Sequence, residues 1–190
     1  MDHRGSESQW ESQEQGKLFE RFLEQTFASG TALPKLTKHL IAVAIASLAG
    51  NPQVGERHRA EAEAEGATAA AIEEAVSVVA TQAGGTQLFW IKEDYEELLG
   101  KHWRRKFLPE VDRSFWTYKR AVFADGALEA RTKELIAIAV SSALRCRHCT
   151  VGYIERALQH GVRQAEIAET LGVLRAVSCE SQHPSGSASP

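Results

Sequence analysis

An internal repeat constrains the fold of this chain more than any other feature. The segment 37–44 (Thr-Lys-His-Leu-Ile-Ala-Val-Ala) recurs as 132–139 (Thr-Lys-Glu-Leu-Ile-Ala-Ile-Ala), at a spacing of 95 residues (132 − 37). At the same spacing, residues 33–80 and 128–175 share 14 identities in 48 positions without a gap. We therefore expect two degenerate copies of one unit, packed about a pseudo-twofold axis around a shared core.

The residues of both copies favour helix almost throughout. Alanine, glutamate, leucine and arginine dominate, and the 190 residues include only five prolines. Apolar residues recur at three- and four-residue spacing in 17–29, and 36–49 is apolar nearly all round, which is typical of a buried central helix. The sequence predicts an all-α protein with helix breaks at Gly50 and at Gly84-Gly85.

We expect four segments along the chain, with the two copies packed as one domain. Residues 1–16 are polar, show no apolar face and are predicted to be a tail. Residues 17–100 form an N-terminal copy without cysteine, which we interpret as scaffold, and 101–179 form a C-terminal copy with a Cys-x-x-Cys pair. Residues 180–190 have the composition of a disordered tail.

Charge and hydropathy argue against nucleic-acid and membrane partners. The net charge is −3, and most Lys and Arg residues are scattered among acids. The basic run 101–106 also contains Trp103, so we interpret it as a helix end or a subunit contact. No apolar stretch approaches the ~18 residues of a membrane span, and no signal-peptide core is present, so we expect a cytoplasmic protein.

The cysteines carry the strongest chemical signal. Cys146 and Cys149 form a Cys-x-x-Cys pair, and Cys179 stands alone. A disulfide needs only two cysteines, whereas a zinc ion needs four ligands. The pair therefore indicates redox chemistry more strongly than metal binding. A zinc site that includes His148 stays as an alternative, as does a helical oligomer whose cysteines are not catalytic. Cys179 is predicted to be a small apolar filler.

The cysteine pair is predicted to lie at the turn into a new helix. Unpaired backbone N–H groups and the helix dipole favour a thiolate there, and Arg145, Arg147 and His148 add positive potential. We therefore predict a lowered thiol pKa. A second cysteine three residues away allows a sulfenic acid to collapse to a disulfide instead of over-oxidising.

Glu134 has two interpretations. It lies in a very apolar helical run, where burial would raise the pKa of its carboxyl toward the range useful for proton transfer. Alternatively, it lies at the helix start, within a turn of Glu129, and stabilises the positive end of the helix dipole.

The region around the cysteines resembles a known family. The run 123–149, together with 157–161 (Ala-Leu-Gln-His-Gly) and 166–169 (Glu-Ile-Ala-Glu), is similar to the core of the carboxymuconolactone decarboxylase and alkylhydroperoxidase D family. The similarity is close over residues 115–175, and the first copy shows a weaker, degenerate form of the same pattern. The resemblance implies an all-helical antioxidant thiol enzyme, without a cofactor, that assembles as a homo-oligomer and reduces hydroperoxides.

The resemblance also implies roles for individual residues. Cys149 would attack the peroxide, Cys146 would resolve it to a disulfide, and Glu134 would assist proton transfer. Electrons would return from a small dithiol or a lipoyl-bearing protein. The decarboxylase branch acts on a lactone and does not depend on a Cys-x-x-Cys pair, so the pair favours the redox branch over a lyase.

One position departs from the family pattern. Tyr153 occupies the place of the family's histidine in Cys-x-x-Cys-x-x-x-His, and a phenol with a pKa near ~10 is a poor base at neutral pH. His148, His160 and His58 are possible substitutes, although solvent exposure is the simpler expectation for each. The sequence therefore predicts either weak peroxidase activity or mainly dithiol oxidoreductase activity.

Overall fold

The structure is a computed structural model that describes residues 3–28 and 32–182, with the backbone alone for residues 3–12. Within these ranges it contains helices and no strand, which confirms the all-α prediction. The helices are α1 (His3–Phe27), α2 (Lys35–Ala49), α3 (Pro52–Ala64), α4 (Ala69–Phe89), α5 (Lys92–Leu99), α6 (Trp103–Phe107), α7 (Pro109–Phe123), α8 (Ala130–Ala143), α9 (Arg147–Gln159) and α10 (Gln164–Glu180).

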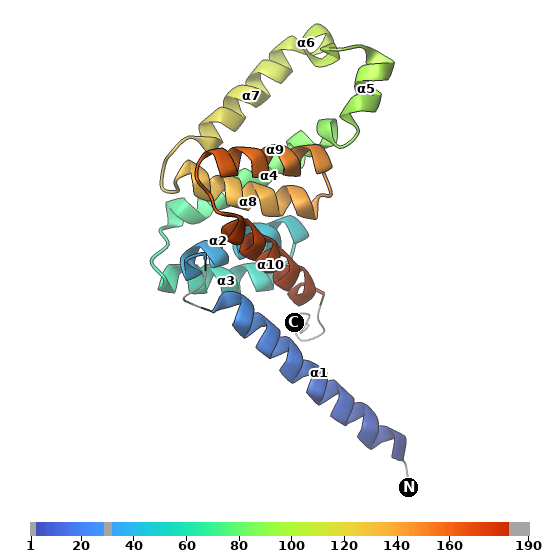
Figure 1. The fold of residues 1–190 in the computed structure, drawn as a ribbon, viewed down its shortest axis with the longest axis vertical. Helices are drawn as coiled ribbons and strands as arrows, with labels where there is room; N and C mark the ends of the chain where they lie inside the picture. Colours follow the sequence, from blue (N-terminus) through green and yellow to red (C-terminus); the bar gives the residue numbers. More distant parts are fainter. Residues whose placement is uncertain (1–2, 29–31, 183–190) are drawn as a thin grey trace.

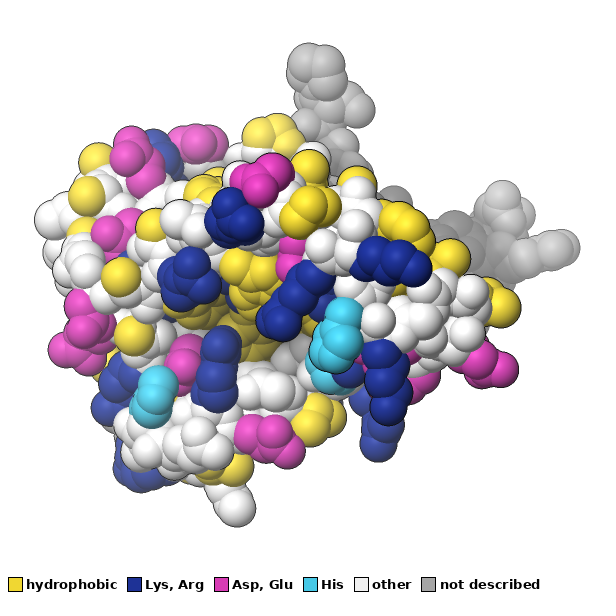
Figure 2. Space-filling view, turned by 90° about the horizontal axis from the view of Figure 1, so that it is seen from above, with side chains coloured by type: hydrophobic (Ala, Val, Ile, Leu, Met, Phe, Trp, Pro, Cys, Tyr) yellow, Lys and Arg dark blue, Asp and Glu magenta, His cyan; other side chains and the backbone are white. Residues whose placement is uncertain are grey.

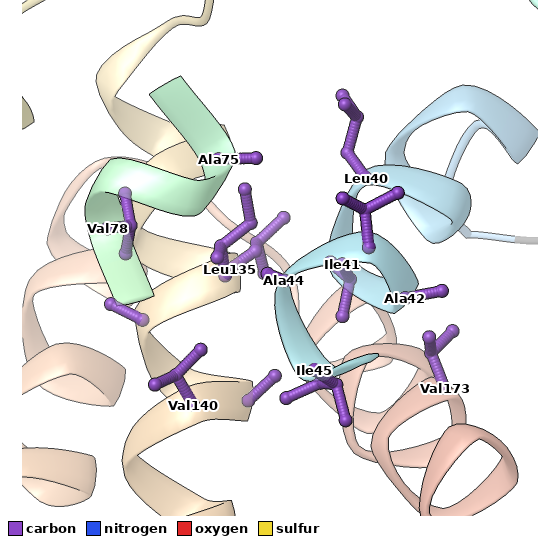
Figure 3. Packing of buried hydrophobic residues seen from close by; sticks show 14 of the residues in the cluster. Leu40, Ile41, Ala42, Ala44, Ile45, Ala75, Val78, Leu135, Val140 and Val173 are labelled. Atoms are coloured by element: carbon purple, nitrogen blue, oxygen red, sulfur yellow. The ribbon is translucent and has the colours of Figure 1, made fainter. Parts of the chain in front are cut away.

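Helices α2 and α8 form the centre of the molecule. They pack against each other, and α4 and α10 each contact both of them (Figure 1). Helix α3 packs on α2 and α9 packs on α8. The core between these helices is made of small and branched aliphatic side chains, including Leu40, Ile41, Ala44, Ile45, Val78, Leu135, Val140 and Val173 (Figure 3).

The helix boundaries follow the repeat found in the sequence. Helices α3 and α9 begin 95 residues apart and end 95 residues apart (147 − 52 and 159 − 64), and α2 and α8 begin 95 residues apart (130 − 35). The two tandem copies are thus α1–α4 and α7–α10. Helices α5 and α6 join the copies, and with α7 they form an arch above α9 and α4 (Figure 1).

A glutamate of the first copy holds a loop of the second copy. Glu74 of α4 accepts hydrogen bonds from the backbone N–H groups of Ala127 (3.0 Å) and Leu128 (2.9 Å), which precede α8. Its Oε2 also lies 2.9 Å from Nζ of Lys133, a lysine that is only 2% exposed. Burial acts to raise the pKa of Glu74, but the Lys133 hydrogen bond and the two backbone hydrogen bonds hold it below its ordinary value.

The reciprocal contact joins the second copy to the first. Glu169 of α10 accepts hydrogen bonds from the backbone N–H groups of Ala32 (2.7 Å) and Leu33 (2.9 Å), and it pairs with buried Lys38 at 3.5 Å. Glu169 and Lys38 correspond to Glu74 and Lys133 at the spacing of 95 residues. Each copy therefore supplies the carboxylate that fixes the entry to the central helix of the other copy.

The two predicted tails need correction where the structure describes them. Residues 1–16 were expected to be a tail, but α1 is helical from His3 onward. Glutamine and glutamate propagate a helix well, and the exposed side chains of 13–15 fit the polar composition of this stretch. At the other end, α10 includes Glu180, which is buried; the predicted disorder of 183–190 lies outside the described residues.

The helix break predicted at Gly84-Gly85 is wrong, because α4 continues through both glycines to Phe89. A Cβ on Gly84 or Gly85 would lie 3.5 or 3.4 Å from the ring of Phe115 in α7. Both distances are ordinary van der Waals contacts, so α4 and α7 pack closely here, and this tertiary packing overrides the weak helix propensity of the glycines.

The arch exposes many apolar side chains. Helices α5, α6 and α7 contain no buried residue, and their exposed large apolar residues are Leu98, Leu99, Phe107, Val111 and Tyr118.

Across residues 3–28 and 32–182, no helix combines the length and the apolar character that a membrane crossing requires.

Gly126 provides a test of the contact between Glu74 and the loop before α8. A Cβ at Gly126 would collide with the Glu74 carboxylate, so we expect Gly126→Ala to lower the free energy of unfolding by about 1–3 kcal/mol, the range for overpacking. The control is Gly172→Ala in α10, where no atom lies within 4 Å of the added Cβ. That control should be neutral or stabilising by up to ~1 kcal/mol. If urea titrations give equal free energies of unfolding for the two variants, the contact between Glu74 and the loop before α8 does not stabilise the fold as described.

Candidate functional site

Cys146 is the N-terminal capping residue of α9. Its Sγ accepts a hydrogen bond from the backbone N–H of Cys149 at 3.4 Å. In the first copy the same position is Asn51, whose Oδ1 accepts from the N–H of Val54 at 3.1 Å. Asparagine is a preferred cap and cysteine is not, so capping alone does not account for a sulfur here. The predicted location of the pair, at the turn into a new helix, is confirmed.

The turn before the pair is held in a conformation that costs energy. Arg145 has φ 56°, in the left-handed region, where its counterpart in the first copy is Gly50 with φ 66°. A glycine adopts this conformation freely, whereas an arginine does so at a steric cost. The second copy therefore keeps the left-handed turn that positions Cys146, although an arginine occupies it in place of a glycine.

The two cysteines differ in accessibility. Cys146 is fully buried, at 0% exposure, whereas Cys149 is half-buried. Cys149 lines a cavity of ≈ 210 Å³, together with Phe89, Trp116, Lys119, His148, Gly152, Tyr153 and Arg156. Seen from the side of the arch, the molecule is hollowed, with hydrophobic side chains on the floor of the hollow and Lys and Arg side chains around it (Figure 2). A small molecule in the cavity therefore meets Cys149 and not Cys146.

The predicted lowering of the thiol pKa is wrong for Cys149. Burial raises the pKa of this thiol from 9.0 to about 12, and the hydrogen bond and charge interaction with Cys146 act in the same direction. Lys119 acts in the opposite direction. The prediction from the sequence counted the nearby arginines, but the fold brings Cys149 into partly apolar surroundings beside a second sulfur.

The raised pKa gives a pH dependence that alkylation can measure. Below its pKa a thiol gains about tenfold in thiolate per pH unit, so we expect the iodoacetamide rate of Cys149 to rise from pH 7 to pH 10 without levelling off. In the protein unfolded by urea, the alkylation rate of Cys149 should level off above the ordinary pKa of a cysteine thiol. A Cys179→Ser background removes the exposed third thiol. A plateau of the folded protein between pH 8 and pH 9 would contradict the raised pKa.

Tyr153 is buried and its hydroxyl is already engaged. The side-chain amide of Gln82 in α4 donates a hydrogen bond to the Tyr153 hydroxyl at 2.6 Å, and the Gln82 carbonyl accepts one from Ser141 at 3.2 Å. The ring stacks on Phe123, with centroids 5.5 Å apart. Tyr153 thus lines the cavity with its ring, while its hydroxyl joins α9 to the first copy.

Glu134 is buried beside a histidine and an arginine. Its Oε2 lies 3.1 Å from Nδ1 of His160, and its Oε1 lies 3.7 Å from Nε of Arg156. Glu134 does not line the cavity itself, but the Arg156 guanidinium does, and it lies 4.3 Å from the centroid of the Tyr153 ring. Glu134 therefore contacts the cavity through Arg156, and neither sequence interpretation describes this arrangement.

The three candidate histidines lie in different surroundings. His148 is exposed, as expected, and stacks on Phe89 with ring centroids 5.5 Å apart. His160 is bonded to Glu134. His58 was expected to be solvent-exposed, but it is 4% exposed and lies in the first copy, bonded to Glu180. The sequence could not indicate this burial because Glu180 is 122 residues away.

Three residues of the site were missed by the sequence analysis. Arg156 lies three residues after Tyr153 on α9, a helical spacing that places both on one face. Gln82 is a polar residue in an otherwise apolar part of α4, which is itself a signal for a buried hydrogen bond. Lys119 is on α7, and nothing in the sequence connects it to the cysteines. Cys179, predicted to be a core filler, is exposed.

The site shows no arrangement suited to a metal. In the described part of the chain, no group of three or more His, Cys, Asp or Glu side chains is placed to hold a metal ion.

Comparison with known families agrees with this architecture. A model of the carboxymuconolactone decarboxylase family matches the chain twice, over residues 13–92 and over residues 109–181. The chain belongs to this family. The two matched segments fit the tandem copies of the structure, so the resemblance seen around Cys146 and Cys149 extends to both halves of the chain.

Two curated relatives match a shorter part of the chain. One, from Paracoccus denitrificans, is named uncharacterized protein 4 in cox locus and is 40% identical over 63 residues. The other is an uncharacterized protein of Cupriavidus necator that is 32% identical over 65 residues. The matches span 33% and 34% of this chain, and 57% and 58% of the respective relatives.

Proposed function

We propose that this protein is a thiol oxidoreductase that reduces hydroperoxides through Cys149 and Cys146. The observation that carries the proposal is the arrangement of the pair. Cys149 faces a cavity, while fully buried Cys146 caps the same helix with its sulfur 3.4 Å from the Cys149 backbone nitrogen. An accessible thiol with a protected thiol beside it is what a peroxide-reducing dithiol requires.

In the first step Cys149 loses its proton and its sulfur attacks the terminal oxygen of the hydroperoxide. The O–O bond breaks, an S–O bond forms, and the leaving alkoxide takes up the released proton as an alcohol. Cys149 becomes a sulfenic acid and the peroxide is reduced by two electrons. Because the pKa of Cys149 is raised, removal of its proton is the demanding part of this step.

In the second step Cys146 attacks the sulfur of the sulfenic acid. An S–S bond forms, the S–O bond breaks, and the leaving hydroxide takes the Cys146 proton as water. Cys146 is shielded from solvent, so it reacts with its neighbour and not with peroxide from bulk. A dithiol donor, either a small molecule or a lipoyl-type group, then reduces the disulfide and is itself oxidised to a disulfide.

The cavity favours a small substrate with an apolar body. Its walls include the rings of Phe89, Trp116 and Tyr153, and its volume of ≈ 210 Å³ is below the ~300–1,000 Å³ of pockets for drug-sized ligands. Lys119 opposes the rise in the pKa of Cys149, so it stabilises the thiolate at the moment of attack.

We assign supporting roles to the other residues of the site. Glu134 holds Arg156, and Arg156 covers the Tyr153 ring and the cavity wall. Because the Tyr153 hydroxyl is engaged by Gln82, Tyr153 acts as a wall and not as the base that the family histidine would supply. His148 lines the cavity and is exposed, and we assign it the transfer of protons between the cavity and solvent.

Turnover with several electron donors tests the proposal. A small alkyl hydroperoxide should be consumed with dihydrolipoamide as donor and more slowly with glutathione, because a dithiol reduces a disulfide without leaving a mixed disulfide. Cys149→Ser should remove the activity, and Cys179→Ser should keep it. Consumption by Cys149→Ser at the wild-type rate would refute the assigned nucleophile, and no turnover with any donor would refute the function.

A further inference from the structure

The cavity beside Cys149 carries an unbalanced positive charge. Lys119 and Arg156 line it, and its described lining residues include no aspartate or glutamate. Lys and Arg side chains also surround the hollow seen from the side of the arch (Figure 2). Because the pKa of Cys149 is raised to about 12, its thiol is neutral at pH 7 and supplies no negative charge. A molecule in the cavity therefore meets cations and no anion.

Lys119 is the cation without a partner. Within the described parts of the chain, its ammonium group makes no hydrogen bond and no ion pair, and its Nζ lies over the rings of Trp116 and Tyr153, 5.2 Å from each centroid. Its charge acts to lower the pKa of Cys149, so it is close enough to the thiol to be felt there. A ligand anion beside this lysine would therefore lie near the reacting sulfur.

The second cation lies over the same rings. The Arg156 guanidinium is 4.3 Å from the centroid of Tyr153, and both cations lie within 6.0 Å of the centroid of Phe123. Glu134, 3.7 Å from Arg156, balances one of the two positive charges. One positive charge is left over, and a singly charged anion between Lys119 and Arg156 would be attracted by both.

The counterpart cavity of the first copy has neither cation. That cavity has a volume of ≈ 250 Å³ and is lined by Leu23, Phe27, His58 and Glu61, among others. The corresponding residues of the second copy are Tyr153 for His58 and Arg156 for Glu61, at a spacing of 95 residues, and Lys119 for Leu23 and Phe123 for Phe27, at a spacing of 96. Phe27 packs on His58 as Phe123 packs on Tyr153, which supports this correspondence. The shared framework therefore requires neither Lys119 nor Arg156.

The cations that line the first-copy cavity are paired with carboxylates. Lys35 Nζ lies 3.1 Å from a carboxylate oxygen of Glu65, and Arg57 pairs with Glu180. An excess of positive charge therefore distinguishes the cysteine cavity from its counterpart.

We propose that the hydroperoxide reduced at Cys149 carries a carboxylate that Lys119 and Arg156 bind. The inference rests on the proposed function and adds its substrate class, the hydroperoxides of small carboxylic acids. The single remaining positive charge matches a carboxylate better than a doubly charged phosphate group, and the aromatic walls suit an aliphatic chain. The carboxylate takes no part in the bond changes, which remain those of attack by the Cys149 sulfur on the terminal peroxide oxygen.

Two alkylating reagents of similar size test the anion site without any peroxide. Iodoacetate carries a carboxylate where iodoacetamide carries an amide, and both react with the same Cys149 thiolate, so the ratio of their rates does not depend on the thiol pKa. In the reduced, full chain with Cys179→Ser, we expect this ratio at Cys149 to be about three- to tenfold higher than in the same chain unfolded by urea, as for a charge-assisted contact. Mass spectrometry of the Cys149 peptide measures both rates.

Lys119→Met should remove most of this increase, and Lys119→Arg should keep it. Arg120→Met is the matched control, because Arg120 is exposed, follows Lys119 on α7 and does not line the cavity. It removes the same charge from the chain and should leave the ratio unchanged. Equal ratios in the folded and unfolded wild-type chain, or equal losses in Lys119→Met and Arg120→Met, would overturn the proposal.

A matched pair of hydroperoxides tests the substrate class. ω-Hydroperoxyhexanoate and its methyl ester share the aliphatic chain and the peroxide group and differ in charge. With dihydrolipoamide as donor, we expect kcat/KM for the acid to exceed that for the ester about three- to tenfold in the wild type and in Arg120→Met, and this preference to be lost in Lys119→Met.

The possible failures are distinguishable. Turnover of the acid and the ester with equal kcat/KM would overturn the carboxylate substrate and leave the dithiol peroxidase in place. No turnover of either peroxide would refute the peroxidase and this substrate class with it, and the alkylation ratio, which needs no peroxide, would then show whether Lys119 still forms an anion site.

Discussion

Lys133→Met is expected to lower the free energy of unfolding by about 2–4 kcal/mol, within or just below the range for breaking a buried ion pair. Lys133 is 2% exposed, and its Nζ donates to the backbone oxygen of Ala124 at 2.5 Å and pairs with Glu74 at 2.9 Å. The substitution leaves a carbonyl without its donor and a carboxylate without its cation. The lower end of the estimate applies because the Glu74 side chain remains 30% exposed to solvent.

Chemical denaturation followed by circular dichroism measures this change. Lys38→Met, the equivalent substitution in the first copy, should cost a similar amount, because Lys38 donates to Thr26 and Ala28 backbone oxygens at 2.8 and 3.0 Å. Lys101→Met serves as the control, since Lys101 is exposed. A loss below ~1 kcal/mol for Lys133→Met would show that this lysine does not stabilise the joined copies.

Cys146→Ser is expected to leave the first reaction with peroxide possible and to block recovery. Without the second thiol, the sulfenic acid of Cys149 cannot form the disulfide, so excess hydroperoxide should drive it to sulfinic and sulfonic acid. Steady-state turnover should fall by more than about 10³-fold, as for the loss of one of two groups that act as a unit.

Mass spectrometry of the peptide that contains Cys149 measures its oxidation state after excess peroxide. Cys179→Ser is the matched control, because Cys179 is exposed and lies outside the pair. That control should retain both turnover and protection of Cys149. If Cys149 of the Cys146→Ser protein stays free of sulfinic acid, the resolving role of Cys146 is wrong.

The sequence predicted the features that depend on local pattern. The repeat of 95 residues, the buried central helix of each copy and the helix start at the cysteine pair all appear in the structure. Helical periodicity and capping act over a few residues, so they can be read from one sequence.

The features that depend on contacts between distant segments were missed. The glycines at 84 and 85 look like a helix break in the sequence, but α4 continues through them and packs against Phe115 of α7. The pairing of Glu74 with Lys133 crosses from one copy to the other, although both residues recur in the repeat. The pKa of Cys149 depends on how deeply the thiol is buried, which no spacing of residues reveals.

Counting thiols after one equivalent of hydroperoxide tests the central claim most directly. The reduced wild-type chain should lose two of its three thiols, and peptide mapping should find one disulfide between Cys146 and Cys149, with Cys179 still free. Cys149→Ser should lose none in the same time. If Cys146 and Cys149 survive as long as an unstructured cysteine peptide, or if oxidation falls mainly on Cys179, the protein is not a dithiol peroxidase.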